Sequence, residues 1–538
     1  MTPAWVPWIS IGCLKIDHMK KQIIFVLLIT LTNLHKASAQ RYFNVLDYGA
    51  KNDSSASATR AIEKAIAAAA GTGGGTVYFP SGKYLTGPIH LRSNITLLID
   101  AGAELDFSDH FEDYLPMVAS RWEGTNVINF SPLFYANQDS NIAIEGRGVL
   151  NGNGKAWWAF AMAQMKDTGP VSKWGDLFHQ ANQGLLEPDD TLWLSRGFLR
   201  PPFIQFMRCK NIRIKDITLK NSPFWTINPE YCENVTVTGV TIQNPKSPNT
   251  DGINPESCRY VHISDCHISV GDDCITIKSG KDKDGRKAAA PAEDYTITNC
   301  TMLSGHGGVV IGSEMSGGVR RIVISNCVFD GTDRGIRIKT ARGRGGVVED
   351  VRVDNIVMHH IGTQAIVLDM QYSTAGPEPV SERTPRFRNI HLSHITGDAA
   401  AAGLINGLEE MPVEDVTIED VQLETEKGFV IKEAKNIAFH HILINARTGP
   451  ALSAQNTEGL ELDGVSSHLP QAKVPVIRFE DVSHVFVHNC WAYPGTDLFL
   501  EILGTKSSHI TGMENDLKEA VMPVSRAGTT EDGTTQFQ

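Results

Sequence analysis

The chain has 538 residues, enough for several ordinary domains, and 41% of them are hydrophobic, as in globular proteins. Its formal net charge is −12 at pH 7. This excess of acids argues against nucleic acid as a partner, and an anionic ligand would need a local basic patch.

The N-terminus has the pattern of an export signal that starts at Met19. A Lys-Lys pair is followed by a short apolar run, Ile23–Leu31, and by a small-residue cleavage pattern at Ala37–Ala39. The apolar run is too short for a stable membrane anchor. We therefore expect residues 1–39 to be a leader and residues 40–538 to form one exported domain, periplasmic or secreted. A buried N-terminal helix is the alternative, which the basic pair and the cleavage pattern disfavour.

Residues Ser57–Ala70, with the sequence SATRAIEKAIAAAA, are typical of a helix that ends at Gly71. It is the one convincing helical pattern in the chain. We expect it to cover the N-terminal end of the structure that follows, where unpaired strand edges need protection.

A short pattern then recurs through most of the chain. A polar residue is followed by apolar residues at alternate positions, as in CKNIRIKDI from Cys209 and CENVTVTGV from Cys232. Earlier partial copies are NITLL at 94–98 and NIAI at 141–144. Later copies begin at Cys258, Ala292, Val319, Val348, Phe387, Val413, Ala434, Thr457 and Val482.

This repeat predicts an all-β solenoid. Short β-branched runs of period two, bounded by Gly, Asn and Asp, indicate strands. Several such strands in a repeat of twenty-odd residues are typical of a right-handed parallel β-helix. A leucine-rich horseshoe is the alternative, but its Leu-x-x-Leu-x-Leu frame and the helices between its strands are missing.

The cysteines also follow the repeat. Two sets each occupy one position of successive copies: Cys209, Cys232 and Cys258, and then Cys266, Cys300, Cys327 and Cys490. An oxidising compartment permits disulfides, but stacked side chains run parallel, which suits bridging poorly. We favour buried free thiols that pack as small hydrophobes. One thiol per coil argues against a metal cluster.

Acidic and basic side chains recur at matching places in successive copies. All lie in the second half of their copy: Asp251, Asp272, Asp273, His306, Arg337 and Lys339. Because coils stack at about 4.8 Å, we expect these side chains to share one face. Asp272 and Asp273 are adjacent and would point to opposite sides of a regular strand, so this arrangement requires a bend at Gly271.

This set of side chains suits acid–base chemistry on a sugar polymer. Two carboxyl groups can act as acid and base at a glycosidic bond. Carboxylates this close repel each other, which keeps a proton on one of them. A guanidinium and an ammonium group suit a substrate that carries a carboxylate. A calcium site is the alternative for the acids, but it leaves His306, Arg337 and Lys339 unexplained.

Four motifs carry a resemblance to a known family. Asn249-Thr250-Asp251, Gly271-Asp272-Asp273, Gly305-His306-Gly307 and Arg337-Ile338-Lys339 follow one another in the order seen in glycoside hydrolase family 28, the polygalacturonase family. The resemblance implies a right-handed parallel β-helix that hydrolyses α-1,4-linked galacturonic acid in pectic chains with inversion. It also implies a monomer that needs no metal and no organic cofactor.

The resemblance also implies a role for each residue of the motifs. Asp272 would be the general acid, and Asp251 and Asp273 would activate the attacking water. His306 would support the ionisation of the acid, and Asn249 would order the site. Arg337 and Lys339 would hold the carboxylate of the substrate.

Other segments resemble the exo-acting, bacterial and plant-like branch of the family. They are RWEG at 121–124, GNGKAWW at 152–158, RPPFIQF at 200–206, NSPFWTINP at 221–229 and IGSEMSGGVRRI at 311–322. The additional chain between Lys155 and Arg200 holds four of the nine Trp residues. We expect it to wall off one end of the groove, which would favour removal of sugars from a chain end.

Two positions depart from the family pattern. Asn254 stands where the family often has Asp, and Asn228 stands where relatives of this branch often have His. A decorated galacturonide, such as a side-chain residue of rhamnogalacturonan, is therefore an alternative substrate. Two further alternatives are a calcium-dependent polysaccharide lyase on the same scaffold and a β-helix that binds sugar without cleaving it.

Overall fold

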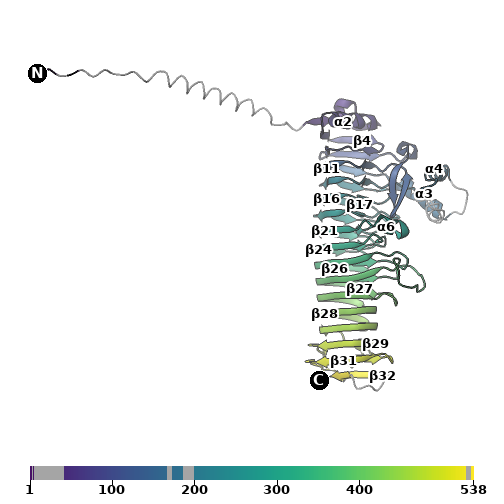
Figure 1. The fold of residues 1–538 in the computed structure, drawn as a ribbon, viewed down its shortest axis with the longest axis vertical. Helices are drawn as coiled ribbons and strands as arrows, with labels where there is room; N and C mark the ends of the chain where they lie inside the picture. Colours follow the sequence, from purple (N-terminus) through teal and green to yellow (C-terminus); the bar gives the residue numbers. More distant parts are fainter. Residues whose placement is uncertain (3, 5–40, 167–171, 186–198, 529–534, 538) are drawn as a thin grey trace.

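The computed structural model describes residues 1–2, 4, 41–166, 172–185, 199–528 and 535–537. From Tyr42 onward the chain winds into one long stack of coils, in which each coil pairs in parallel with the one before it (Figure 1). The predicted export signal lies outside these residues. Within them, no helix is long and apolar enough to cross a membrane.

The first strand of each coil follows the recurring sequence pattern. These strands pair in register: β1 (Tyr42–Asn44), β3 (Gly75–Phe79), β6 (Ile95–Ile99), β11 (Ser140–Gly146), β14 (Lys210–Lys215), β16 (Glu233–Thr238), β18 (Arg259–Ser264) and β21 (Ala292–Thr298). Their alternate apolar residues point inward. Ile212, Val235 and Val261, for example, occupy one column and are buried.

A second set of strands forms another face of the stack. It consists of β2 (Asp53–Ser57), β4 (Gly82–Thr86), β7 (Ala103–Phe107), β12 (Val149–Asn151), β15 (Thr218–Lys220), β17 (Thr241–Gln243), β19 (His267–Ser269) and β22 (Thr301–Ser304). The third set consists of β5 (Ile89–His90), β10 (Phe134–Asn137), β13 (Ile204–Met207), β20 (Ile275–Ile277), β23 (Val309–Ile311) and β25 (Ile336–Lys339). Between β13 and β20, single bridges at Ile227 and Ile253 continue this third face.

Further along, the strands of one coil run together around its corners. These long strands are β24 (Val319–Asp330), β26 (Val347–Asp369), β27 (Arg386–Asn406), β28 (Val413–Ser466) and β29 (Pro475–His488). The stack ends with β30 (Leu498–Leu503), β31 (Ser508–Met513), β32 (Met522–Ala527) and β33 (Thr535–Phe537). The predicted parallel β-helix is confirmed. The eight cysteines after the leader are buried free thiols, as predicted.

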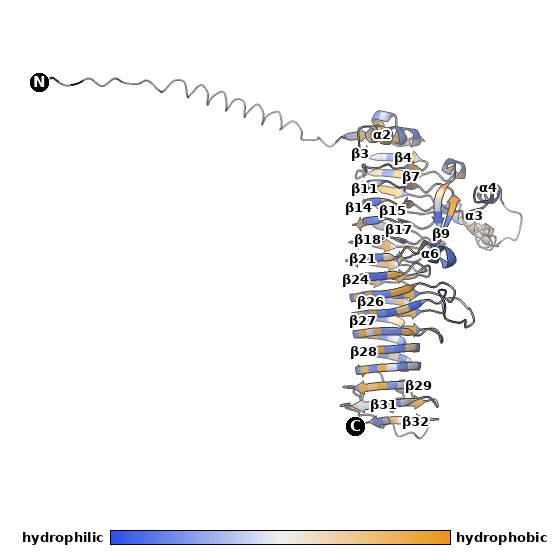
Figure 2. Ribbon diagram, viewed as in Figure 1, coloured by the Kyte–Doolittle hydropathy of each residue, from blue (hydrophilic) through white to orange (hydrophobic). Residues whose placement is uncertain are grey.

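The predicted helix is α2 (Thr59–Gly71), which begins two residues later than expected. One face of the helix is buried against the first coils, and it lies at the N-terminal end of the stack (Figure 1); the buried residues are Ala61, Ile62, Ala65, Ile66 and Ala69. The other described helices are short: η2 (Val45–Tyr48), η3 (Phe111–Tyr114), α3 (Lys155–Lys166), α4 (Lys173–Ala181) and α6 (Asp282–Ala288). Apolar colour reappears along the strands of every coil (Figure 2), as expected for a core that runs the length of the stack.

An antiparallel hairpin leaves the stack and folds over its third face. It consists of β8 (Val118–Trp122) and β9 (Thr125–Asn129). Its two-residue turn, Glu123–Gly124, has positive φ at both positions, 39° and 84°, which is the tight type I′ geometry. The Asn182 side chain at the end of α4 bonds both the N–H and the C=O of Ile128, so α4 supports the hairpin from behind.

A buried ion cluster fixes the hairpin to the stack. The guanidinium of Arg121 lies 2.7 Å from Glu256 and 3.4 Å from Glu230, and all three side chains are fully buried. Arg121 also contacts Asp284 of α6 at 3.1 Å. Beside it, the ring of Trp122 stacks on Phe224 with 3.8 Å between centroids. The ion pairs of Arg121 and the stacking of Trp122 therefore hold the hairpin against the stack of coils.

Replacing Arg121 should destabilise the protein strongly. Arg121→Ala leaves two buried glutamates without their counter-charge, so we expect a loss of about 3–5 kcal/mol in the free energy of unfolding. The matched control is Arg213→Ala, which removes an exposed partner of Glu145 and should cost no more than about 1 kcal/mol. Urea unfolding of both variants measures the difference. Equal stability of the two would contradict the role given to the cluster.

Candidate active site

The three predicted acids meet at one place on the third face. Asp251 and Asp273 each lie two residues before paired isoleucines of adjacent coils, Ile253 and Ile275, so they occupy the same position of the repeat. Oxygen atoms of Asp251, Asp272 and Asp273 all lie within 4.8 Å of one another. The chain is not a regular strand at 270–274, so the bend expected at Gly271 is present.

Each acid has different surroundings. Asp251 is buried, and its Oδ2 accepts hydrogen bonds from Asn254 Nδ2 at 3.1 Å and from the Thr276 hydroxyl at 3.3 Å. Asp273 is also buried and accepts from Lys339 Nζ at 2.9 Å. Asp272 keeps about a fifth of its side chain exposed (20%) and has His306 Nδ1 at 3.2 Å.

These surroundings separate the pKa values of the acids. Burial, and then the charge of Asp272, raise the pKa of Asp251 well above its usual range. Burial acts in the same direction on Asp272, but the hydrogen bond and the charge of His306 outweigh it and lower the pKa of Asp272. The hydrogen bond to Asp272 in turn raises the pKa of His306. In the free protein, the proton that such a cluster retains therefore favours Asp251.

The two predicted cations reach the same cluster. Arg337 Nη1 lies 3.8 Å from Asp273 Oδ1, whereas the Lys339 ammonium contacts Asp273 Oδ2. Both cations lie beside the ring of Tyr372, at 5.4 Å for Arg337 and 5.2 Å for Lys339. Tyr372 was not predicted, because it lies in the loop that follows β26.

Around the acids lies a small polar pocket of about 250 Å³. Besides the predicted acids, Asn249 and Lys339, it is lined by Glu123, Trp225, Lys278, Lys281, Ser313, Glu314, Arg344 and Tyr372. Lys278 is buried, bonds Glu314 and lies 4.8 Å from the ring centre of Trp225. Glu123 and Glu314 lie in the branch-like segments RWEG and IGSEMSGGVRRI, but no sequence pattern assigned any of these additional charged residues to the site.

Arg200 is a further residue that the sequence reading missed. Its Nη2 donates to Asn249 Oδ1 at 2.8 Å, and its Nη1 donates to the carbonyl of Pro248. The side chain is fully buried, and this burial lowers its pKa to about 10. Arg200 thus holds the turn that carries Asn249 and Asp251. Its segment, RPPFIQF, had been noted only as a mark of one branch.

The tip of the hairpin forms part of the wall of the pocket. Its tip residue Glu123 lines the pocket, and the main-chain N–H of Lys281 donates to the carbonyl of Gly124. A Cβ at Gly124 would lie 2.6 Å from that nitrogen, so only glycine permits the contact. The segment after Lys155 was expected to form this wall. Its described helices, α3 and α4, contribute no residue to the pocket, and residues 186–198 lie outside the description.

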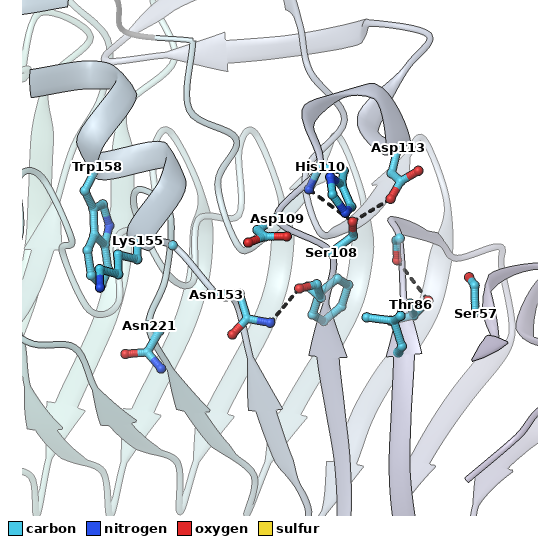
Figure 3. A pocket seen from close by; sticks show the side chains of 14 residues that line it. Ser57, Thr86, Ser108, Asp109, His110, Asp113, Asn153, Lys155, Trp158 and Asn221 are labelled. Atoms are coloured by element: carbon cyan, nitrogen blue, oxygen red, sulfur yellow. Dashed lines mark hydrogen bonds between the residues drawn. The ribbon is translucent and has the colours of Figure 1, made fainter. Parts of the chain in front are cut away.

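A larger cleft of about 650 Å³ lies elsewhere, where the turns after the second strands meet the start of α3. Figure 3 shows its polar lining, with Asp109 and His110 on one side and Lys155 and Trp158 on the other. None of the predicted site residues lines it. The acid cluster therefore belongs to the smaller pocket alone.

A long β-helix with clustered carboxyl groups in a polar pocket defines a carbohydrate-active enzyme. Comparison with known proteins is more specific. The family model "Glycosyl hydrolases family 28" matches residues 195–428, and "Rhamnogalacturonase A/epimerase, pectate lyase-like" matches residues 42–168. A crystal structure of an exopolygalacturonase from Thermotoga maritima shares 34% identity with a TM-score of 0.69, covering 76% of this chain and 92% of that one. The chain belongs to glycoside hydrolase family 28 and is a glycoside hydrolase.

Curated relatives cover less of the sequence. "Probable polygalacturonase" of Vitis vinifera is 33% identical over 325 residues, which span 59% of this chain and 60% of that protein. "Exo-poly-alpha-D-galacturonosidase" of Dickeya chrysanthemi is 27% identical over 353 residues, 62% of this chain and 58% of that protein. The chain thus spans about three fifths of these two relatives.

His306 should titrate above its usual pKa of about 6.5, because Asp272 stabilises the imidazolium. In Asp272→Asn this charge is lost, so the midpoint of His306 should fall. NMR of histidine-labelled protein measures both midpoints, with His306→Gln to assign the resonance. An unchanged midpoint in Asp272→Asn would show that the two side chains do not interact.

Proposed function

We propose that the protein is an exo-acting polygalacturonase, which hydrolyses the terminal α-linked galacturonic acid of pectic chains with inversion. The observation that carries this proposal is the gathering of three carboxyl groups within 4.8 Å, in a small pocket whose wall includes the hairpin tip Glu123. We also propose that the protein is exported, because substrates of this kind lie outside the cell and the leader pattern predicts it.

The proposed roles follow the environment of each acid. Asp272 is the most accessible of the three, so it protonates the leaving oxygen. Asp251 and Asp273 lie in adjacent coils, and together they activate the attacking water. His306 contacts Asp272 and adjusts its charge, while Arg200 and Asn249 order the turn that carries Asp251. These are acid and base roles that two or three carboxyl groups can share.

The proton must reach Asp272 before the bond breaks. In the free protein burial favours a proton on Asp251. A sugar in the pocket removes water from Asp272, the one partly exposed acid, and thereby raises its pKa. Because the carboxyl oxygens lie within 4.8 Å, the proton has only a short distance to move. Binding of the substrate thus prepares the acid.

Cations explain how a protein with a net charge of −12 binds a polyanion. The pocket is lined by Lys278, Lys281, Lys339 and Arg344, and Arg337 lies next to it. Lys278 is largely neutralised by Glu314. Lys339 and Arg337 lie nearest to the acids, so they are best placed to hold the carboxylate of the sugar that is cleaved.

The size of the pocket supports action at a chain end. Its volume of about 250 Å³ is below the range of about 300–1,000 Å³ typical of drug-sized ligands, as expected for a site that holds one sugar residue. The hairpin tip blocks extension of the chain beyond it. The names of the Thermotoga and Dickeya relatives also describe exo action.

The stereochemical outcome needs a direct measurement. Inverting glycosidases usually hold their two carboxyl groups about 6.5–9.5 Å apart and retaining ones about 5 Å apart. The separation of at most 4.8 Å between oxygens here resembles the second class, whereas the family resemblance implies inversion. Two carboxylates that hold one water between them would reconcile the short distance with inversion. Proton NMR of the anomer that forms first decides between the two outcomes.

Digestion of oligogalacturonides should release galacturonic acid singly, with no change when a chelator is present. Asp272→Asn should lower kcat by at least about a hundredfold, because the general acid is lost. Chromatography of early time points gives the products, and Asp109→Asn, in the separate cleft, is the matched control. Long oligomers at early times would contradict exo action. Unsaturated, calcium-dependent products would instead indicate a lyase.

A further inference from the structure

Three amide side chains lie in one column of the third face, directly beneath the hairpin. Gln205, Asn228 and Asn254 each follow an isoleucine that pairs with its equivalent in the next coil. All three side chains are fully buried. Asn228 and Asn254 are the two positions at which the sequence departs from the family pattern, and the proposed function gives neither of them a role.

Hydrogen bonds join this column into a chain that ends at the acid cluster. Ser120 Oγ of the hairpin donates to Gln205 Oε1 at 2.7 Å, and Gln205 Nε2 donates to Asn228 Oδ1 at 2.9 Å. Asn228 Nδ2 donates to the main-chain carbonyl of Asn254 at 2.8 Å. Asn254 Nδ2 then donates to Asp251 Oδ2 at 3.1 Å. Turning Gln205 or Asn228 over would oppose like groups, so the network fixes their direction.

We propose that Asn254 is a positioning residue whose hydrogen bond favours the ionised form of Asp251, so that the single proton of the acid cluster passes from Asp251 to Asp272 when the sugar binds. An amide NH2 can only donate, and a carboxylate accepts more strongly than a neutral carboxyl group. The Thr276 hydroxyl also contacts Asp251, but it can donate or accept and so permits either state. This inference rests on the proposed function of the same site.

Some of the other groups around Asp251 favour its protonated form, and others favour its ionised form. Burial and the charges of Asp272 and Asp273 favour the protonated form, whereas Lys278 and Lys339 favour the ionised form. Arg200 and the buried thiol of Cys274 also interact with Asp251 electrostatically, and Glu123 and Glu314 line the same pocket. The amide of Asn254 thus acts on a balance between opposing charges, where one directed hydrogen bond has a large effect.

The chemistry of position 254 explains why an amide matters there. An Asp in this place would put a second carboxyl group in hydrogen-bond contact with Asp251, and the pair would share a proton. Asp251 would then remain protonated to higher pH and would act as a base only above that pH. Asn254 avoids this, although its Oδ1 is buried without a hydrogen-bond partner among the described residues.

The test compares Asn254→Asp and Asn254→Leu with the wild type, using the pH dependence of kcat/KM on an oligogalacturonide. We expect the acid side of the profile of Asn254→Asp to move to higher pH by about one unit, which is a loss of about tenfold on that side. Activity should recover toward the wild-type level at higher pH, with KM nearly constant. Asn254→Leu, which lacks the donor but adds no acid, should show a smaller shift in the same direction.

Asn228→Ser is the matched control. It removes hydrogen bonds from the same column without contacting Asp251. It should therefore lower the midpoint temperature of thermal unfolding but leave the acid side of the pH profile unchanged. A merely structural role for Asn254 predicts that its variants behave like Asn228→Ser, with activity lost equally at every pH. That result would overturn the proposal. If the Leu variant does not fold, Asn254→Ala takes its place.

A second measurement needs no activity. Potentiometric titration of the folded proteins should show that Asn254→Asp binds its additional proton well above the usual Asp pKa of about 3.9. Asn254→Leu should take up a proton at higher pH than the wild type. Curves that coincide for Asn254→Leu and the wild type would overturn the inference. The titration shifts could also appear although the wild type cleaves no oligogalacturonide. That result would contradict the proposed substrate but would still support the role of Asn254.

Discussion

The in-register parallel pairing of successive coils is the constraint on which the site depends. Because Ile227, Ile253 and Ile275 pair in sequence, the residues that precede them are stacked at fixed spacing. Asp251 and Asp273 meet for this reason, although 21 positions of the chain separate them. Turns between the strands vary in length without disturbing this register, since Ile275 pairs with Val309 across a longer turn, but an insertion between Asp273 and Ile275 would move the acid out of its column. The turns near the site are accordingly close-packed: a Cβ at Gly271 would lie 2.4 Å from the Ser247 carbonyl.

The hairpin turns an open face of the solenoid into a pocket. A solenoid alone presents a long shallow groove, which suits an internal segment of a polymer. Here the third face carries buried glutamates, Glu230 and Glu256, that would face water without the hairpin and its Arg121. The same hairpin places Glu123 in the wall of the pocket. The stability of the protein and the shape of the pocket therefore both depend on the docking of the hairpin, which Asn182 at the end of α4 supports.

The repeat was readable in the sequence because each coil repeats the same local pattern. The strands, the buried thiols and the meeting of Asp251, Asp272 and Asp273 all follow from that pattern and from counting positions, and the α2 helix follows from its own helical sequence. Arg200, Lys278 and Glu123 did not follow from it. Their roles come from contacts between a hairpin, a turn and a loop that are distant in sequence, and no local periodicity reports such docking. The Glu-Gly pair at its turn was the one local sequence feature that could indicate the hairpin.

The three acids differ less in chemistry than in access to water. Asp251 and Asp273 are already dry, and a sugar in the pocket changes their hydration little. Asp272 is partly exposed, so in the proposed mechanism a sugar removes its water and raises its pKa. The hydrogen bond from Asn254 favours the ionised form of Asp251, against the burial that favours its protonated form in the free protein. In this proposal the bound sugar shifts the proton from Asp251 to Asp272, where it lies beside the bond that is to break.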